Sequence, residues 1–187
     1  MTILTRRGLV AAGAVLAAPG VLRAQNARPT VLMELKDGRV IIEMRPDLAP
    51  RHVERITQLT ERGFYNNCPF HRVIPGFMAQ TGDPTGTGTG GARSIGFPDL
   101  PAEFSPPSRA RFIRGTCGMA RTQDPNTANS QFFIMFAPNQ GLDGQYTIWG
   151  SVISGMDVVD RIKAGTQQNN GAVPPPVDRI RRMTLGN

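Results

Sequence analysis

The sequence has few of the side chains on which most enzyme chemistry depends. Its 187 residues include only two histidines and two cysteines. Cys68 and His71 form a C-x-x-H arrangement, but His52 and Cys117 are distant in the chain, so no four-ligand metal spacing appears. There is no G-x-S-x-G nucleophile motif. The sequence therefore predicts no metal and no covalent nucleophile, and we expect His71 to be a hydrogen-bonded structural histidine.

The chain is basic, but its positive charges are not concentrated in any one segment. The net charge of +7 would suit a polyanionic partner. However, the Lys and Arg residues are scattered and do not alternate with aromatic residues, as they do in grooves that follow a phosphate backbone. We predict a solvated basic surface and no nucleic-acid binding.

Long apolar runs are also missing, and one short run lies near the N-terminus. Arg6 and Arg7 precede it, residues 9–22 form it, and Leu22-Arg23-Ala24 resembles a signal-peptidase site. The run is shorter than the ~20 apolar residues that span a bilayer. We predict that residues 1–24 are a cleaved signal peptide of the twin-arginine type, with the Sec route as an alternative. Residues 25–187 would then be one periplasmic domain without a membrane span.

An exported protein meets an oxidising compartment, so a disulfide between Cys68 and Cys117 is chemically allowed. The alternative is two small buried thiols that never meet. The sequence leaves both open.

Short β-rich runs separated by turn residues dominate the rest of the chain. Asp37-Gly38 joins two of them as a hairpin turn would. Pro50 opens a helix with apolar residues three and four positions apart, and Gly63 ends it. A second helix is predicted at 156–163, and strands at 31–35, 40–44, 70–73, 77–81, 116–120, 131–135, 146–152 and 179–185. This pattern predicts an all-β barrel rather than alternating strands and helices.

A long Gly- and Pro-rich connection, residues 82–115, contains a formal match to G-x-G-x-x-G at 86–91. Dinucleotide binding requires a helix directly after that motif, and Gly96 and Pro98 would break one. We therefore predict a surface loop and no nucleotide cofactor.

Two segments combine large apolar side chains with hydrogen-bonding ones: FHRVIPGFMAQTGD at 70–83 and MARTQDPNTANSQFFI at 119–134. Residues two apart in a strand share a face, so Met78 and Gln80 can point the same way, and Arg72 can join them from the neighbouring strand. Composition alone also allows the apolar residues to be ordinary core.

These segments resemble the two signature regions of the cyclophilins, a family of peptidyl-prolyl cis-trans isomerases. The resemblance continues through residues 82–88, 102–104 and 142–144 and covers essentially the whole chain after residue 24. Residues 119–122 are most similar to small bacterial exported members. The resemblance implies an all-β fold, an eight-stranded antiparallel closed barrel capped by two short helices, with the active site on its outer face.

The resemblance also implies roles for single residues. Arg72 matches the catalytic arginine, and Phe133 is expected to point into the core. The substrate-binding residues would be an apolar wall of Phe77, Met78, Phe132 and Leu142, the amides of Gln80 and Gln131, the backbone of Ala120 and Arg121, and Tyr146. Gly141 stands where many eukaryotic members carry a Trp that contacts cyclosporin, so cyclosporin binding is expected to be weak.

The implied function is the acceleration of X-Pro bond rotation in unfolded or newly exported polypeptides, which assists folding. Rotation breaks no covalent bond, so it requires no nucleophile, metal or cofactor. A proline-binding chaperone or scaffold with negligible turnover is the alternative. The presence of Arg72 and Gln80 favours the enzyme.

Overall fold

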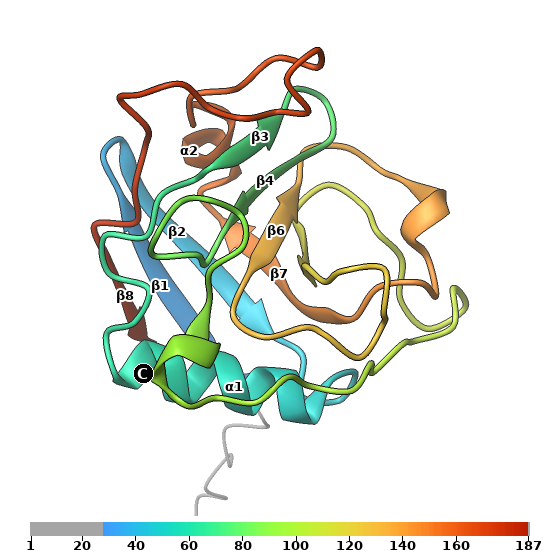
Figure 1. Ribbon diagram of the computed structural model, residues 1–187. Helices are drawn as coiled ribbons and strands as arrows, with labels where there is room; N and C mark the ends of the chain where they lie inside the picture. The colour runs from blue at the N-terminus through green and yellow to red at the C-terminus, as the bar shows by residue number, and fades with distance from the viewer. Residues whose placement is uncertain (1–27, 187) are drawn as a thin grey trace, which may run out of the picture.

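One antiparallel sheet forms most of the molecule, as the computed structural model of residues 28–186 shows (Figure 1). The predicted signal peptide lies outside the described residues. The strands are β1 (Thr30–Leu35), β2 (Gly38–Met44), β3 (Arg72–Ile74), β4 (Met78–Thr81), β5 (Thr116–Met119), β6 (Phe132–Met135), β7 (Ile148–Ser154) and β8 (Arg182–Leu185). The helices are α1 (Pro50–Glu61) and α2 (Met156–Asp160), with short 3₁₀ turns η1 (Ala92–Ile95) and η2 (Gln140–Leu142).

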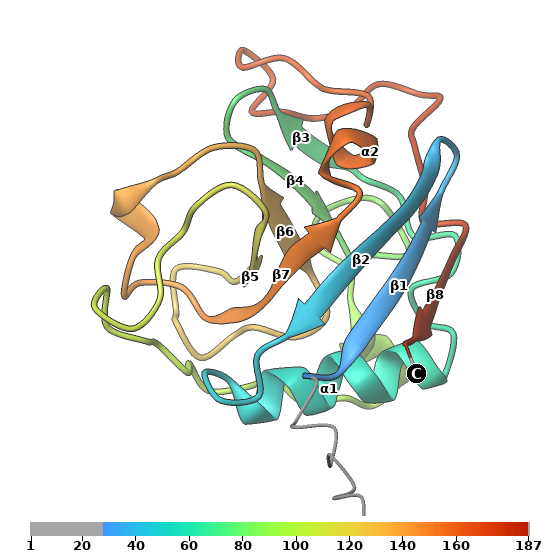
Figure 2. The same ribbon diagram turned by 180° about the vertical axis from the view of Figure 1, so that it is seen from behind.

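The sheet has the strand order β3-β4-β6-β5-β7-β2-β1-β8, and it curls around the core (Figures 1 and 2). Among the described residues, no ladder joins the edge strands β3 and β8. The backbone just ahead of each strand bridges the gap instead: the Asn67 N–H donates to Ile180 O at 2.7 Å, and the Phe70 N–H to Asp178 O at 2.8 Å. The predicted eight-stranded antiparallel fold with two helices is confirmed. The sheet is a curled half-barrel, and these hydrogen bonds, together with the isolated antiparallel pair Pro69–Arg179, link the segments ahead of its two edge strands.

Helix α1 covers one end of the curled sheet, and α2 lies toward the other end (Figures 1 and 2). Helix α1 begins at Pro50. Proline suits this position because the N–H of a first-turn residue has no partner within the helix, so its absence costs nothing. Val53, Ile56 and Leu59 are buried on its inner face. The spacing of the apolar residues therefore predicted this helix, although it ends at Glu61, two residues before Gly63.

The long connection between β4 and β5 is anchored to α1. Ala49, at the N-cap, provides no side-chain cap. The Glu103 carboxylate accepts the backbone N–H groups of Arg51 and His52 at 3.3 and 3.1 Å, and lies 2.7 Å from His52 Nδ1. This carboxylate satisfies N–H groups that a helix start leaves without partners.

Apolar residues form two clusters on opposite faces of the sheet. The larger cluster, inside the curl, includes Phe132, Ile134 and Trp149. It also holds Cys68 and Cys117, which are buried free thiols, and burial raises the pKa of Cys68 to about 12. The smaller cluster contains Leu48, Met78, Phe112, Phe133, Met135 and Ile148. The alternation along β4 and β6 therefore places a second apolar patch on the outer face.

Candidate active site

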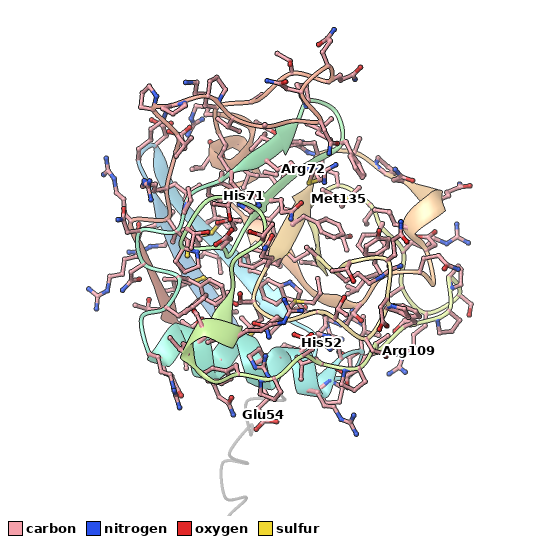
Figure 3. All side chains as sticks on the ribbon, in the orientation of Figure 1. His52, Glu54, His71, Arg72, Arg109 and Met135 are labelled. Atoms are coloured by element: carbon pink, nitrogen blue, oxygen red, sulfur yellow. The ribbon has the colours of Figure 1, made fainter. Side chains whose placement is uncertain are left out.

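Strands β3 and β4 place three predicted site residues on the outer face of the sheet. Arg72 is paired with Gln80 in the antiparallel register, and Ile74 with Met78. Paired residues point to the same face, and so do residues two apart in one strand. Arg72, Gln80 and Met78 therefore converge. Figure 3 shows Arg72 next to His71, far from His52 on α1.

These side chains border a cavity of about 470 Å³. Of the predicted site residues, it is lined by Arg72, Phe77, Met78, Gln80, Ala120, Arg121, Leu142 and Tyr146. Gln131 lies in an adjoining hollow of about 250 Å³, which shares Gln80, Ala120 and Arg121 with the first cavity. The structure brings together every predicted site residue except Phe132.

Phe132 and Phe133 have the opposite orientations to those expected. Phe132 is fully buried in the interior, with its ring edge-on to Trp149 at 5.2 Å between centroids. Phe133 lines the cavity and lies 5.9 Å from the Tyr146 ring. The register explains the correction, because β6 pairs Phe133 with Gln80, which faces the cavity. The signal was present in the sequence: Gln131 and Phe133 are two apart and share a face.

Hydrogen bonds fix the polar side of the cavity. Arg72 Nη1 donates to Gln80 Oε1 at 3.2 Å, and Gln80 Nε2 donates to Gln131 Oε1 at 2.8 Å. Gln131 Nε2 donates in turn to the carbonyl oxygens of Gly88 and Gly90 at 3.0 and 2.8 Å. These hydrogen bonds therefore form one continuous network, which runs from the guanidinium through both amides to the glycine-rich loop.

Several lining residues were not predicted from the sequence. The glycine-rich loop contributes Gly86, Thr87 and Gly88, and the segment after α2 contributes Asn169, Asn170 and Ala172. An isolated β-bridge pairs Arg72 with Ala172, which brings this segment against β3. Asn170 then accepts two hydrogen bonds from Arg72, 98 positions earlier in the chain. No local pattern signals so distant a contact.

The cavity keeps a fixed positive charge beside a neutral imidazole. Burial lowers the pKa of Arg72, and Tyr146 opposes this, but an arginine guanidinium stays protonated in proteins. Burial also lowers the pKa of His71, which favours its neutral form. Neither ring nitrogen of His71 has a hydrogen-bond partner among the described residues. The Pro69 backbone and the Gln131 side chain nevertheless lie close enough to the ring to raise the pKa of His71 against the effect of burial, so the expectation that His71 is hydrogen bonded stays a prediction.

The arrangement suits binding and orientation rather than bond cleavage. Within residues 28–186, no group of three or more His, Cys, Asp or Glu side chains is placed to hold a metal ion. The cavity offers a charged hydrogen-bond donor facing aromatic and aliphatic side chains. Such a site can hold a small apolar ring and polarise a group attached to it.

The family model described as cyclophilin type peptidyl-prolyl cis-trans isomerase/CLD matches residues 30–185. The chain belongs to this family. It is therefore a peptidyl-prolyl cis-trans isomerase. This assignment favours the enzyme over the alternative of a proline-binding chaperone without turnover.

Similar proteins agree with this assignment. The cyclophilin is 50% identical over 194 residues to a probable peptidyl-prolyl cis-trans isomerase of Brucella suis, covering 96% of this chain and 95% of the relative. It is 42% identical over 151 residues to peptidyl-prolyl cis-trans isomerase-like 1 of Aspergillus fumigatus, covering 81% of this chain and 90% of the relative.

Solved structures have the same fold. A cyclophilin type isomerase of Cryptosporidium parvum, crystallised in the presence of the dipeptide ala-pro, has a TM-score of 0.72 and 27% identity, over 84% of this chain and 99% of that one. A cyclophilin of Hirschia baltica has a TM-score of 0.68 and 26% identity, over 83% and 73%. In the described part of this cyclophilin, no helix has the length and apolar character needed to cross a bilayer.

Proposed function

We propose that this cyclophilin isomerises X-Pro bonds in the cavity beside Arg72, and that its substrates are unfolded or newly exported polypeptides. The observation that carries the proposal is the position of Arg72. Its guanidinium borders a cavity whose other walls include Phe77, Met78 and Leu142, and Gln80 holds it from the adjacent strand. A charged donor therefore faces an apolar space suited to a proline ring.

The chemistry required is the twisting of an amide. Amide resonance sets a barrier of ~18–20 kcal/mol. When the bond twists, conjugation is lost and the proline nitrogen gains a lone pair that can accept a hydrogen bond. A guanidinium aimed at that nitrogen binds the twisted state better than the planar one, which lowers the barrier. Arg72 suits this role because its fork is planar and permanently charged.

The apolar wall would hold the proline ring in place. In this proposal Phe133 takes the position first expected for Phe132, beside Met78 and Leu142. Exclusion of water by these side chains strengthens the electrostatic interaction between Arg72 and the substrate.

The backbone of Ala120 and Arg121 would bind the substrate chain. The Ala120 N–H already donates to Gln131 O at 2.9 Å. Within residues 28–186, the backbone hydrogen bonds outside the strands include none from the Arg121 N–H and none to the carbonyls of Ala120 and Arg121, so these groups can bind the peptide backbone.

Replacement of Arg72 tests the proposal. A hydrogen bond from a charged group contributes ~1.5–3 kcal/mol, so Arg72→Ala should lower kcat/KM by ~10- to 200-fold. Affinity for a proline peptide should change much less, and Arg72→Lys should restore only part of the rate. A protease-coupled isomerisation assay and a peptide-binding titration measure the two effects. Full activity in folded Arg72→Ala protein would overturn the mechanism.

We also propose that the protein acts in the periplasm after loss of residues 1–24. The support is the Arg6-Arg7 pair ahead of a short apolar run. Replacing both arginines by lysine should trap the precursor if export uses the twin-arginine route. Normal export of that variant would refute the route, and an uncleaved cytoplasmic protein would refute export itself.

A further inference from the structure

Most of the hydrogen-bonding capacity of Arg72 is already used within the protein. A guanidinium has five N–H donors. The Nε donor binds the backbone oxygen of Asn170 at 3.0 Å, Nη2 binds Asn170 Oδ1 at 2.9 Å, and Nη1 binds Gln80 Oε1 at 3.2 Å. One N–H on each Nη therefore remains for a ligand.

The two oxygens of Asn170 hold one whole edge of the guanidinium. Nε and Nη2 form that edge, so Asn170 binds it in a bidentate manner, and Gln80 holds the opposite nitrogen. Three anchors fix both the plane and the rotation of the group. This matters because Arg72 lies on β3, an edge strand of only three residues, and a free arginine side chain has ~2 kcal/mol of rotamer entropy.

The backbone around Asn170 is built to present these oxygens. Asn170 has φ of 50°, in the left-handed region that Asn tolerates better than most residues. Its N–H donates to Gln167 O at 3.0 Å, and the Gly171 carbonyl accepts the Val73 N–H at 2.7 Å. A Cβ at Gly171 would collide with Ile74 Cγ1. The glycine therefore allows the turn to lie directly against β3.

We propose that Asn170 is a positioning residue for isomerisation, which orients the Arg72 guanidinium toward the twisted amide. The inference rests on the proposed catalytic role of Arg72. A neutral amide suits the task because it accepts a hydrogen bond without neutralising the guanidinium. The positive charge then remains available to the substrate.

Asn170→Gly isolates the side-chain contribution. Glycine adopts positive φ readily, so the backbone bond to Arg72 Nε is kept and only the Oδ1 acceptor is lost. Loss of this hydrogen bond should reduce the stabilisation of the transition state by ~1.5 kcal/mol, which lowers kcat/KM about tenfold. Affinity for a proline peptide should be nearly unchanged. Gln168→Gly is the matched control, because it adds the same backbone freedom at an exposed position of the same loop. This control should retain full activity.

A double-mutant cycle separates positioning from a purely structural effect. Lysine has no fork to orient, so Asn170→Gly should have little further effect on Arg72→Lys protein. A full rate for Asn170→Gly, or an equal loss in both backgrounds, would overturn the inference while leaving the role of Arg72 intact. Full activity of Arg72→Ala would instead overturn the proposed mechanism itself.

Discussion

At the scale of single residues, Phe132 and Phe133 are neighbours in the sequence, but their rings lie on opposite faces of the sheet and have different roles. Phe132 packs with Tyr65 and Trp149 in the interior, so Phe132→Ala should lower the free energy of unfolding by ~3–5 kcal/mol. Phe133→Ala should instead weaken binding of a proline peptide, because it removes cavity wall. Urea denaturation and peptide titration of folded protein distinguish the two. Weaker binding in Phe132→Ala than in Phe133→Ala would contradict the assignment.

Gly141 lies in η2, one residue before Leu142, which lines the cavity. A Cβ there would meet only Asn139 Oδ1, at 3.1 Å, and otherwise open space. A larger side chain can therefore be accommodated. We expect cyclosporin to inhibit the protein weakly and Gly141→Trp to be inhibited more strongly, because a buried ring adds a few kcal/mol at ~25 cal/mol per Å². Inhibition titrations of both forms test this, and equal inhibition would show that position 141 does not contact the drug.

At the scale of elements, one carboxylate organises the glycine-rich loop. Asp83 is fully buried and accepts the N–H groups of Thr85, Gly88 and Gly90 at 2.8, 2.8 and 3.1 Å. Burial alone would raise the pKa of Asp83, but the hydrogen bonds outweigh it and the pKa is lowered. The loop in turn supplies the carbonyl oxygens that bind Gln131. The loop that matches the G-x-G-x-x-G pattern therefore holds Gln131 in place at the isomerase site.

Asp83→Asn should loosen this loop and reduce isomerase activity, because an amide cannot accept all of these bonds. Faster hydrogen exchange of the Gly88 and Gly90 amides would report the loosening. A lowered folded-state pKa means that the stabilisation is complete above the ordinary aspartate pKa and is lost only as pH falls through the folded value. Loop protection should therefore be constant from pH 7 to about 5 and decline below about 4. Loss of protection already at pH 6 would contradict this role.

At the scale of the whole molecule, the buried His52 and the half-buried His71 make stability depend on pH. Burial lowers the pKa of His52, although Glu103 opposes this, and burial lowers that of His71. Below about pH 6.5 the unfolded chain therefore binds protons that the native protein does not. The free energy of unfolding should fall as pH drops from 7.5 to 5.5, by at most ~1.4 kcal/mol per pH unit for each histidine. Urea denaturation at the two pH values measures it, and a flat profile would contradict the burial argument.

The sequence by itself determined the order of the elements and half of the site. Asp37-Gly38 and Pro50 predicted the hairpin and the start of α1, because turn and capping preferences act over a few residues. Arg72 and Gln80 were placed together correctly because a short hairpin fixes the register between them. The resemblance added the expected chemistry of the cavity.

Only the tertiary structure decided which face of β6 turns toward the cavity and what holds Arg72. All four residues of β6 are buried, so Gln131, just before the strand, was the one sequence signal for its orientation, and packing against Trp149 placed Phe132 in the core. Asn170 reaches Arg72 across 98 positions, and the hydrogen bond between Phe70 and Asp178 joins segments that are even further apart in the chain. Such contacts form because the curled sheet brings its two edges together, and no local preference of the chain encodes them.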